Sequence, residues 1–118
     1  MFGLRKSRVQ RIDPCEAVAR HARGDLTVID VREAAELRAS GTARGALHVP
    51  LALLPIKADP RHPGHDPALD PDRPVALYCA AGGRSGMAAE LLMKLGYREV
   101  YNIGGFGDWC AGGGQTCR

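Results

Sequence analysis

Cys79 lies between a segment with the pattern of a buried strand and a segment with the pattern of a helix. Residues 75–78 are a short apolar run, and residues 84–95 repeat apolar side chains on one helical face. Four small residues separate the cysteine from that helix: Ala80, Ala81, Gly82 and Gly83. They let the backbone curl so that several amides face the sulfur, and the helix dipole adds positive potential there. Because this environment favours an anion, we predict that Cys79 is a nucleophilic thiolate.

Two polar residues open the predicted helix. Arg84 adds a fixed cation and Ser85 adds a hydroxyl, and both are expected to lower the pKa of the Cys79 thiol. A cysteine at the end of a strand is more often only a small buried apolar residue. That interpretation weakens because the cysteine, the small loop, the Arg-Ser pair and the helix start coincide within seven consecutive residues.

Strands and helices alternate around this loop, as they do in an α/β domain. We expect strands at 8–12, 26–29, 46–49, 75–78 and 99–103, and helices at 14–21, 32–39 and 84–95. The apolar face of the last helix is expected to comprise Met87, Ala88, Leu91, Leu92 and Leu95. Since a helix joins the last two strands, they are predicted to be parallel neighbours in a right-handed crossover. Residues 59–74, rich in Asp, Pro and His, are expected to form a surface loop.

The composition is that of one globular domain. The 118 residues are 45% hydrophobic and 25% charged, with a net charge of +3. We expect a single domain over 1–118 with a core at about 8–109 and a flexible Gly-rich tail at 110–118. The basic cluster comprises Arg5, Lys6, Arg8 and Arg11. It is too mild to indicate nucleic-acid binding, and no apolar run predicts a membrane span or a signal segment, so we expect a cytoplasmic protein.

Four segments occur in the order that is typical of single-domain rhodaneses, a family of sulfurtransferases: DVREAAEL, GALHVP, CAAGGRS and GGFGDW. Over about residues 12–109 the chain resembles that family. The resemblance implies a three-layer α/β/α domain with a five-stranded, mostly parallel sheet. It also implies that Cys79 carries sulfur as a persulfide, taken from thiosulfate or a similar small anionic donor. The acceptor would be cyanide, a thiol or a protein, and no metal or organic cofactor would be needed.

The same resemblance suggests roles for the residues near the cysteine. The amides from Ala80 through Ser85 would hold the negative charge of the persulfide. Arg84 would hold the loop or the anionic end of the donor. Arg32 of the DVRE segment is a second candidate for anion binding or for an internal ion pair, and Asp30 is expected to brace the loop. The segment GTARGA at 41–46 lacks the usual His and Pro of the family, which affects only that connection.

Two other functions remain open. A cysteine-based phosphatase also has a cysteine loop that ends in arginine, but its loop is one residue longer than the four residues between Cys79 and Arg84. A smaller ring suits a sulfur atom better than a phosphate, and Asp108, a conceivable general acid, is expected to face solvent. Alternatively, the domain is a docking module without catalysis, or it loads sulfur chiefly for delivery to a protein partner. The presence of Cys79 argues against the first of these.

The remaining cysteines have no spacing typical of a zinc site or a disulfide framework, so we predict free thiols and no metal site. Cys15 is expected to face the core from the start of the first helix. Cys110 and Cys117 fall in the Gly-rich tail, where either could attack a Cys79 persulfide as a resolving thiol, or could be incidental.

Overall fold

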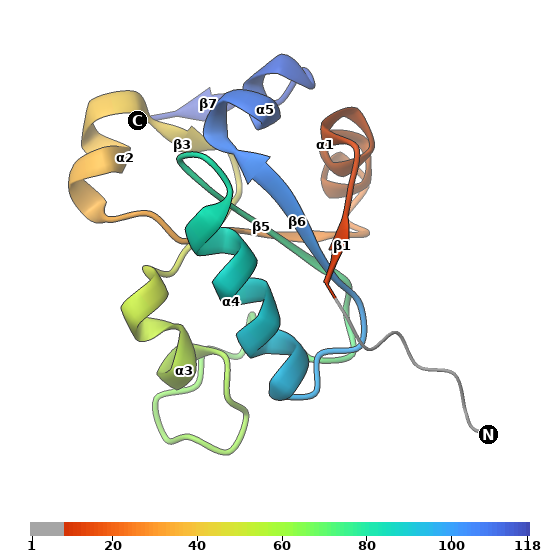
Figure 1. Ribbon diagram of the computed structural model, residues 1–118, viewed down its shortest axis with the longest axis vertical. Coiled ribbons are helices and arrows are strands. Elements are labelled where there is room, and N and C mark those ends of the chain that lie inside the picture. Colours follow the sequence, from red (N-terminus) through yellow and green to blue (C-terminus); the bar gives the residue numbers. More distant parts are fainter. Residues whose placement is uncertain (1–8) are drawn as a thin grey trace.

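A computed structural model describes residues 9–118 as a parallel β-sheet with helices on both faces (Figure 1). Five strands form the sheet in the order β1-β6-β5-β2-β4, and every neighbouring pair is parallel. They are β1 (Gln10–Arg11), β2 (Thr27–Asp30), β4 (Leu47–His48), β5 (Val75–Cys79) and β6 (Val100–Gly105). The predicted five-stranded α/β fold is confirmed. Of the basic cluster, Arg5, Lys6 and Arg8 lie outside the described residues, and so does the start of the first predicted strand.

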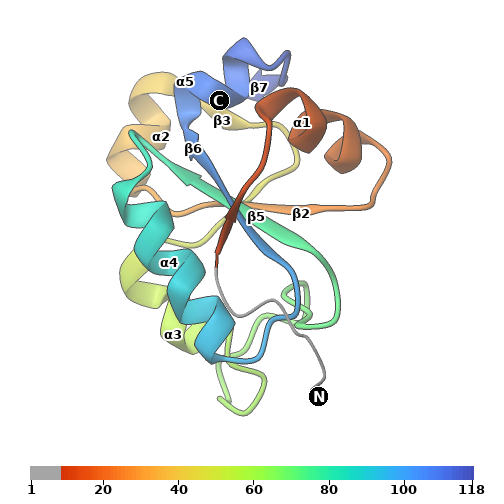
Figure 2. The same cartoon turned by 45° about the vertical axis from the view of Figure 1, so that its right-hand side comes forward.

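Helices cover both faces of this sheet, so the domain has three layers (Figure 2). They are α1 (Pro14–Ala22), α2 (Ala34–Ser40), the 3-10 turn η1 (Leu51–Leu53), α3 (Leu54–Lys57), α4 (Gly83–Lys94) and α5 (Phe106–Ala111). In Figure 2, α3 and α4 lie on one side of the sheet and α1 on the other. Within residues 9–118, no helix is long and apolar enough to cross a membrane.

Side chains alternate along β5 and so divide the apolar core into two clusters. Val75, Leu77 and Cys79 pack on the face that α4 covers, whereas Ala76 and Tyr78 pack on the face that Trp109 of α5 covers. A central strand that is buried on both faces has to be apolar at every position, which explains the unbroken apolar run at 75–78. The core therefore holds β5 rigidly from both sides and fixes the position of its last residue, Cys79.

Three expectations about single segments are wrong. Cys15 is exposed on α1 and does not face the core. Met87 is 60% exposed, because it lies on the side of α4 that faces away from the buried residues Ala88, Ala89 and Leu92. The segment at 110–118, expected to be a flexible tail, continues α5 to Ala111 and then forms β7 (Thr116–Cys117). This strand pairs with β3 (Thr42–Ala43) in an antiparallel ladder. The partner strand lies far away in the sequence, so local composition gives no sign of it.

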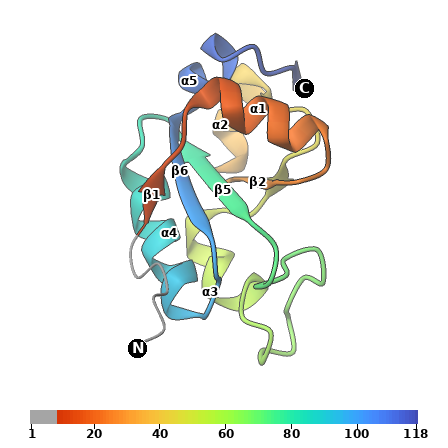
Figure 3. The same ribbon diagram turned by 90° about the vertical axis from the view of Figure 1, so that its right-hand side faces the viewer.

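The loop at 59–74 lies at the end of the molecule opposite the carboxyl end of β5, as Figure 3 shows. It leads into the first residue of β5, whereas Cys79 is the last. Leu69 of this loop is buried, and its carbonyl oxygen lies 3.3 Å from the hydroxyl of Tyr97, just after α4. The loop therefore packs beneath the far end of α4 and is not part of the surroundings of Cys79.

Candidate active site

The Cys79 sulfur is surrounded by hydrogen-bond donors at the carboxyl end of the central strand. Only 1% of the residue is exposed. The backbone amide of Gly82 donates to the sulfur at 2.9 Å, and the hydroxyl of Ser85 lies 3.4 Å from it. Gly82 has a φ of +107°, a left-handed conformation that is costly for any residue with a Cβ. This conformation turns the Gly82 amide inward, so glycine is required at that position.

Two opposing effects act on the pKa of the Cys79 thiol. Burial raises the pKa, because it disfavours the charged form. Hydrogen bonds from the Ser85 side chain and from the amides of Ser85, Gly82 and Ala81 lower it, and their combined effect is the larger. The pKa therefore lies below its ordinary value, as the sequence predicts. A buried thiolate with donors around it is a nucleophile, and the same donors can stabilise negative charge on an atom attached to the sulfur.

Arg84 of α4 forms an ion pair with Glu36 of α2. Its two terminal nitrogens donate to the two carboxylate oxygens at 2.7 and 2.8 Å. These bonds lower the pKa of Glu36 to about 2, while the carboxylate raises the pKa of Arg84. Both side chains are about one-third exposed, so solvent screens the pair in part. The ion pair thus joins the start of α4, directly after the cysteine loop, to α2.

Arg32 and Asp30 form a second ion pair in the interior beside the loop. The Nη2 of Arg32 lies 2.8 Å from the Oδ2 of Asp30, and its Nε donates to the Oδ1 at 3.0 Å. The Nη1 of Arg32 also donates to the Ser40 hydroxyl, and its Nη2 to the Gly41 carbonyl. Asp30 also accepts a hydrogen bond of 2.7 Å from the Tyr78 hydroxyl. Burial raises the pKa of Asp30, whereas its hydrogen bonds with Arg32 and Tyr78 lower it, and their combined effect is the larger. The pKa therefore lies below its ordinary value, and the carboxylate stays charged. Of the two roles expected for Arg32, the structure contains the internal ion pair.

Asn102 of β6 belongs to the site, although the sequence analysis did not single it out. Its Oδ1 accepts hydrogen bonds from the Ser85 hydroxyl at 2.8 Å and from the Gly104 amide at 2.9 Å. Its Nδ2 donates to the carbonyl of Gly82 at 3.1 Å. One signal could have identified it, because Asn102 is a polar residue inside the otherwise apolar run at 100–103, on a strand that was predicted to pair with the cysteine strand.

Gly105 is a second residue of the site that the sequence analysis missed. A Cβ atom on Gly105 would lie 2.4 Å from the carbonyl oxygen of Ala80, which is closer than real Cβ atoms approach backbone. The end of β6 therefore touches the cysteine loop directly. The GG pair of the segment GGFGDW was visible in the sequence, but its contact with the loop depends on the register between β5 and β6.

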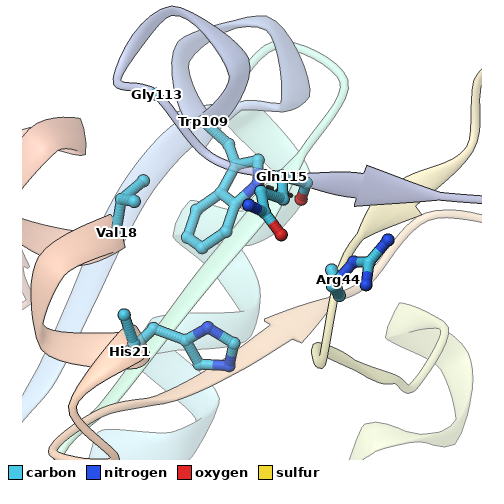
Figure 4. A pocket seen from close by; sticks show the side chains of 7 residues that line it. Val18, His21, Arg44, Trp109, Gly113 and Gln115 are labelled. Atoms are coloured by element: carbon cyan, nitrogen blue, oxygen red, sulfur yellow. Dashed lines mark hydrogen bonds between the residues drawn. The ribbon is translucent and has the colours of Figure 1, made fainter.

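Two cavities formed by residues within 9–118 lie away from the cysteine loop. One of about 340 Å³ lies between α1 and α5, with Trp109, Gln115, His21 and Arg44 around it (Figure 4). Another, of about 450 Å³, is lined by Leu37, Arg38, Thr42, Cys117 and Arg118. Cys110 and Cys117 are both exposed. Within the described part of the chain, no three His, Cys, Asp or Glu side chains are grouped as a metal site would require.

Known proteins resemble this chain in both sequence and structure. The family model "Rhodanese-like domain" matches residues 13–112. A sulfurtransferase of Allochromatium vinosum is 36% identical over 90 residues, which are 75% of this chain and 76% of the relative. Thiosulfate sulfurtransferase GlpE of Coxiella burnetii is 33% identical over 88 residues, 74% of either chain. The solved structure of a Rhodopseudomonas palustris protein of unknown function, described as a possible tyrosine phosphatase, has a TM-score of 0.83 at 30% identity. The match covers 92% of this chain and 85% of the Rhodopseudomonas chain. With its cysteine loop between β5 and α4, this chain belongs to the rhodanese-like domain family.

Proposed function

We propose that this protein is a sulfurtransferase in which Cys79 carries the sulfur as a persulfide. The observation that carries the proposal is the 2.9 Å contact between the Cys79 sulfur and the Gly82 amide, in a loop that lowers the pKa of the thiol. A thiolate in such a loop can attack a sulfur donor, and the same donors can hold the charge of the product. The names of the Allochromatium and Coxiella relatives support this function.

The first step forms the persulfide. The Cys79 thiolate attacks the outer sulfur of thiosulfate or of a similar small anionic donor, and a new S–S bond forms. The S–S bond within thiosulfate breaks, its electron pair goes to the departing sulfite, and the negative charge of Cys79 moves to the outer sulfur of the persulfide. Each bond change is a displacement at sulfur, so the step consumes no electrons from a redox cofactor.

The second step releases the sulfur. Cyanide or a thiolate acceptor attacks the outer sulfur, the bond between that atom and the Cys79 sulfur breaks, and its electron pair returns to Cys79 as the thiolate. Cyanide leaves as thiocyanate, and a thiolate acceptor leaves as a persulfide. The acceptor can also be a cysteine of another protein, because the chemistry at the outer sulfur is the same.

The surrounding residues have separate roles in this proposal. The amides from Ala80 through Ser85 hold the charge of the persulfide, and Gly82 already contacts the sulfur. Arg84 attracts the anionic end of the donor while its bonds to Glu36 hold the loop. Asp30 and Arg32 brace the chain beside the loop through their internal ion pair. A reducing compartment such as the cytoplasm suits this chemistry, because Cys15 and the two carboxyl-terminal cysteines are exposed thiols that would oxidise elsewhere.

The test is the intact mass of the reduced protein before and after addition of thiosulfate. We expect the wild type to gain one sulfur atom, and then to lose it to cyanide with formation of an equal amount of thiocyanate. Cys79→Ser should do neither. Cys110→Ser is the matched control, because Cys110 is an exposed cysteine outside the loop, and it should behave as the wild type does.

A protein that gains no sulfur from thiosulfate or from a low-molecular-weight persulfide would contradict the proposal. Sulfur that loads equally well onto Cys79→Ser would contradict the assignment of Cys79. A domain that delivers sulfur chiefly to a protein partner would load one sulfur but release it slowly to cyanide. That result would retain the persulfide and replace only the acceptor.

A cysteine-based phosphatase is the second candidate, because the Rhodopseudomonas protein is described as a possible tyrosine phosphatase. Two observations make it weaker than sulfur transfer. Only four residues lie between Cys79 and Arg84, one fewer than in the loop of a cysteine-based phosphatase. Asp108, a conceivable general acid, accepts a hydrogen bond from the Gly105 amide at 2.7 Å and so caps α5. Hydrolysis of p-nitrophenyl phosphate that requires Cys79 would favour the phosphatase.

A further inference from the structure

The hydroxyl of Ser85 has one proton and more than one acceptor within reach. The side chain is fully buried. Its oxygen lies 2.8 Å from Asn102 Oδ1, 3.2 Å from the Gly82 carbonyl, and 3.4 Å from both the Cys79 sulfur and the Gly104 carbonyl. A hydroxyl donates one hydrogen bond at a time, so these acceptors compete for it. The shortest distance identifies Asn102 as the acceptor while the sulfur is uncharged.

Asn102 is held in place independently of Ser85. Its Oδ1 also accepts from the Gly104 amide, and its Nδ2 donates to the Gly82 carbonyl. These two bonds determine which end of the amide group faces Ser85, since an exchange of Oδ1 and Nδ2 would break both. The oxygen of Asn102 is therefore a fixed acceptor next to the serine.

We propose that Asn102 is a positioning residue that competes with the Cys79 sulfur for the Ser85 proton. Ser85 donates to Asn102 when the sulfur is a neutral thiol, and it turns to the sulfur when the sulfur is a thiolate. One part of the inference rests on the proposed function: when Cys79 is a persulfide, its inner sulfur is again uncharged, so the hydroxyl returns to Asn102.

This competition has two consequences. The thiolate gains the Ser85 hydrogen bond only when the bond to Asn102 is given up, so the thiolate is stabilised less than Ser85 alone could stabilise it. Since a thiolate with a very low pKa is a weak nucleophile, Asn102 preserves the reactivity of Cys79. The buried hydroxyl also keeps an acceptor in every state of the cycle, so no state leaves it unsatisfied.

Two substitutions break the same hydrogen bond yet are predicted to act in opposite directions on the pKa of Cys79. Ser85→Ala removes a donor to the thiolate and should raise the pKa. Asn102→Ala removes the nearest competing acceptor and should lower the pKa, because the carbonyls of Gly82 and Gly104 lie farther from the hydroxyl, at 3.2 and 3.4 Å, and compete with the sulfur less strongly. The Gly82 amide should stay in place in this variant, since the Gly82 carbonyl also accepts a hydrogen bond of 3.0 Å from the Gly86 amide.

The charged side chains on the elements around the loop are common to all these variants. They are Arg84 and Glu36 from α4 and α2, Asp30 and Arg32 on and after β2, Asp108 from α5, and Arg11 from β1. Because none of them changes, their effect on the pKa of Cys79 cancels in the comparison. Asn102→Asp is a further variant with the shape of the wild type. Its carboxylate is a stronger acceptor and carries a negative charge, so it should raise the pKa.

The experiment measures the rate of iodoacetamide alkylation of Cys79 against pH in the full-length reduced protein, with the Cys79 peptide quantified by mass spectrometry. The expected midpoint moves by about half to one pH unit, down in Asn102→Ala and up in Ser85→Ala. The double variant Ser85→Ala/Asn102→Ala should match Ser85→Ala alone, because Asn102 acts through Ser85. If Asn102→Ala does not fold, Asn102→Asp is measured with and without Ser85. Its upward shift should be larger with Ser85 present than in the Ser85→Ala background, because the negative charge acts in both backgrounds and the competition in only one.

Three results would overturn the inference: an upward shift in Asn102→Asp that is equally large in the Ser85→Ala background, a shift of Asn102→Ala in the same direction as Ser85→Ala, or additive shifts in the double variant Ser85→Ala/Asn102→Ala. A purely structural role of Asn102 predicts the second of these, because loosening the loop would withdraw donors from the sulfur in both variants. Alkylation needs no sulfur donor or acceptor. The inference can therefore fail while sulfur transfer is observed, and it can succeed while sulfur transfer is not.

Discussion

Glu36 of α2 accepts two hydrogen bonds from Arg84 of α4, at 2.7 and 2.8 Å. The pair joins the helix that follows β2 to the helix that follows the cysteine loop. Arg84 is the first residue after the small residues of that loop, so the position of the loop depends on α2 as well as on its own backbone. Two side chains that lie 48 positions apart in the chain thus act on one site.

The Glu36–Arg84 pair should make stability depend on pH in acid. The pKa of Glu36 in the folded protein is about 2, below its ordinary value of 4.5. A lowered pKa contributes stability that is fully present above about pH 4.5 and is lost as the pH falls from there toward 2. Glu36→Gln should show a smaller loss of stability over this range in urea unfolding. Glu90→Gln is the control, because Glu90 is an exposed residue of α4. Its free energy of unfolding should depend on pH as it does in the wild type.

The buried ion pair beside the loop should be costly to break from one side. Arg32→Met leaves the fully buried carboxylate of Asp30 without its cation, and we expect a loss of about 3–5 kcal/mol in urea unfolding. Asp30→Asn/Arg32→Met removes both charges and should recover part of that loss. A double variant as unstable as the sum of the two single variants would contradict the interpretation of Arg32 as an internal partner of Asp30.

Gly105 should be essential for activity because its backbone touches the cysteine loop. In Gly105→Ala the new Cβ would lie 2.4 Å from the Ala80 carbonyl oxygen, so the loop has to move. We expect the rate of sulfur loading to fall at least ~10-fold, since small displacements of a reacting group reduce rates strongly. Gly107→Ala is the matched control in α5, where a Cβ meets nothing within 4 Å.

The Gly107→Ala control should load sulfur at the wild-type rate. Its free energy of unfolding should rise by about 0.5–1 kcal/mol, because alanine has a higher helix propensity than glycine. Equal rates in the two alanine variants would show that the contact between Gly105 and Ala80 does not position the loop. Both rates are measured from the mass gain after mixing with thiosulfate.

The carboxyl-terminal strand should contribute to stability rather than to sulfur transfer. Removal of residues 115–118 deletes β7, its pairing with β3 and the hydrogen bond from Trp109 to the Gln115 carbonyl. We expect a lower melting temperature and a loss of about 1–2 kcal/mol. Hydrogen exchange should become faster at Arg44, whose amide donates to the Gln115 carbonyl at 2.8 Å. Cys117→Ser in the intact chain keeps the ladder and should leave both measurements unchanged, whereas an equally stable truncated protein would contradict this role.

Much of the site could be predicted from local sequence alone. The strand, the small loop and the helix start around Cys79 follow one another in the chain, and their backbone preferences are local properties. The parallel sheet could also be predicted from the sequence, because strands that are joined by helices have few possible arrangements. Asp30 lies at the end of β2, next to the cysteine strand, and it was identified because the DVRE segment resembles a family pattern.

Tertiary structure decided which side chains meet at that loop. Glu36, Asn102 and Gly105 reach it from α2 and β6, and their contacts depend on strand order, on the register between β5 and β6, and on the bulge in that register. The pairing of β7 with β3 is likewise a contact between distant segments. Sequence analysis detects preferences within a short window, whereas these contacts arise only when the folded core fixes the distances between separate elements. Cys79 was therefore identified from the sequence as the candidate nucleophile, but the contacts that Glu36, Asn102 and Gly105 make around its loop were not.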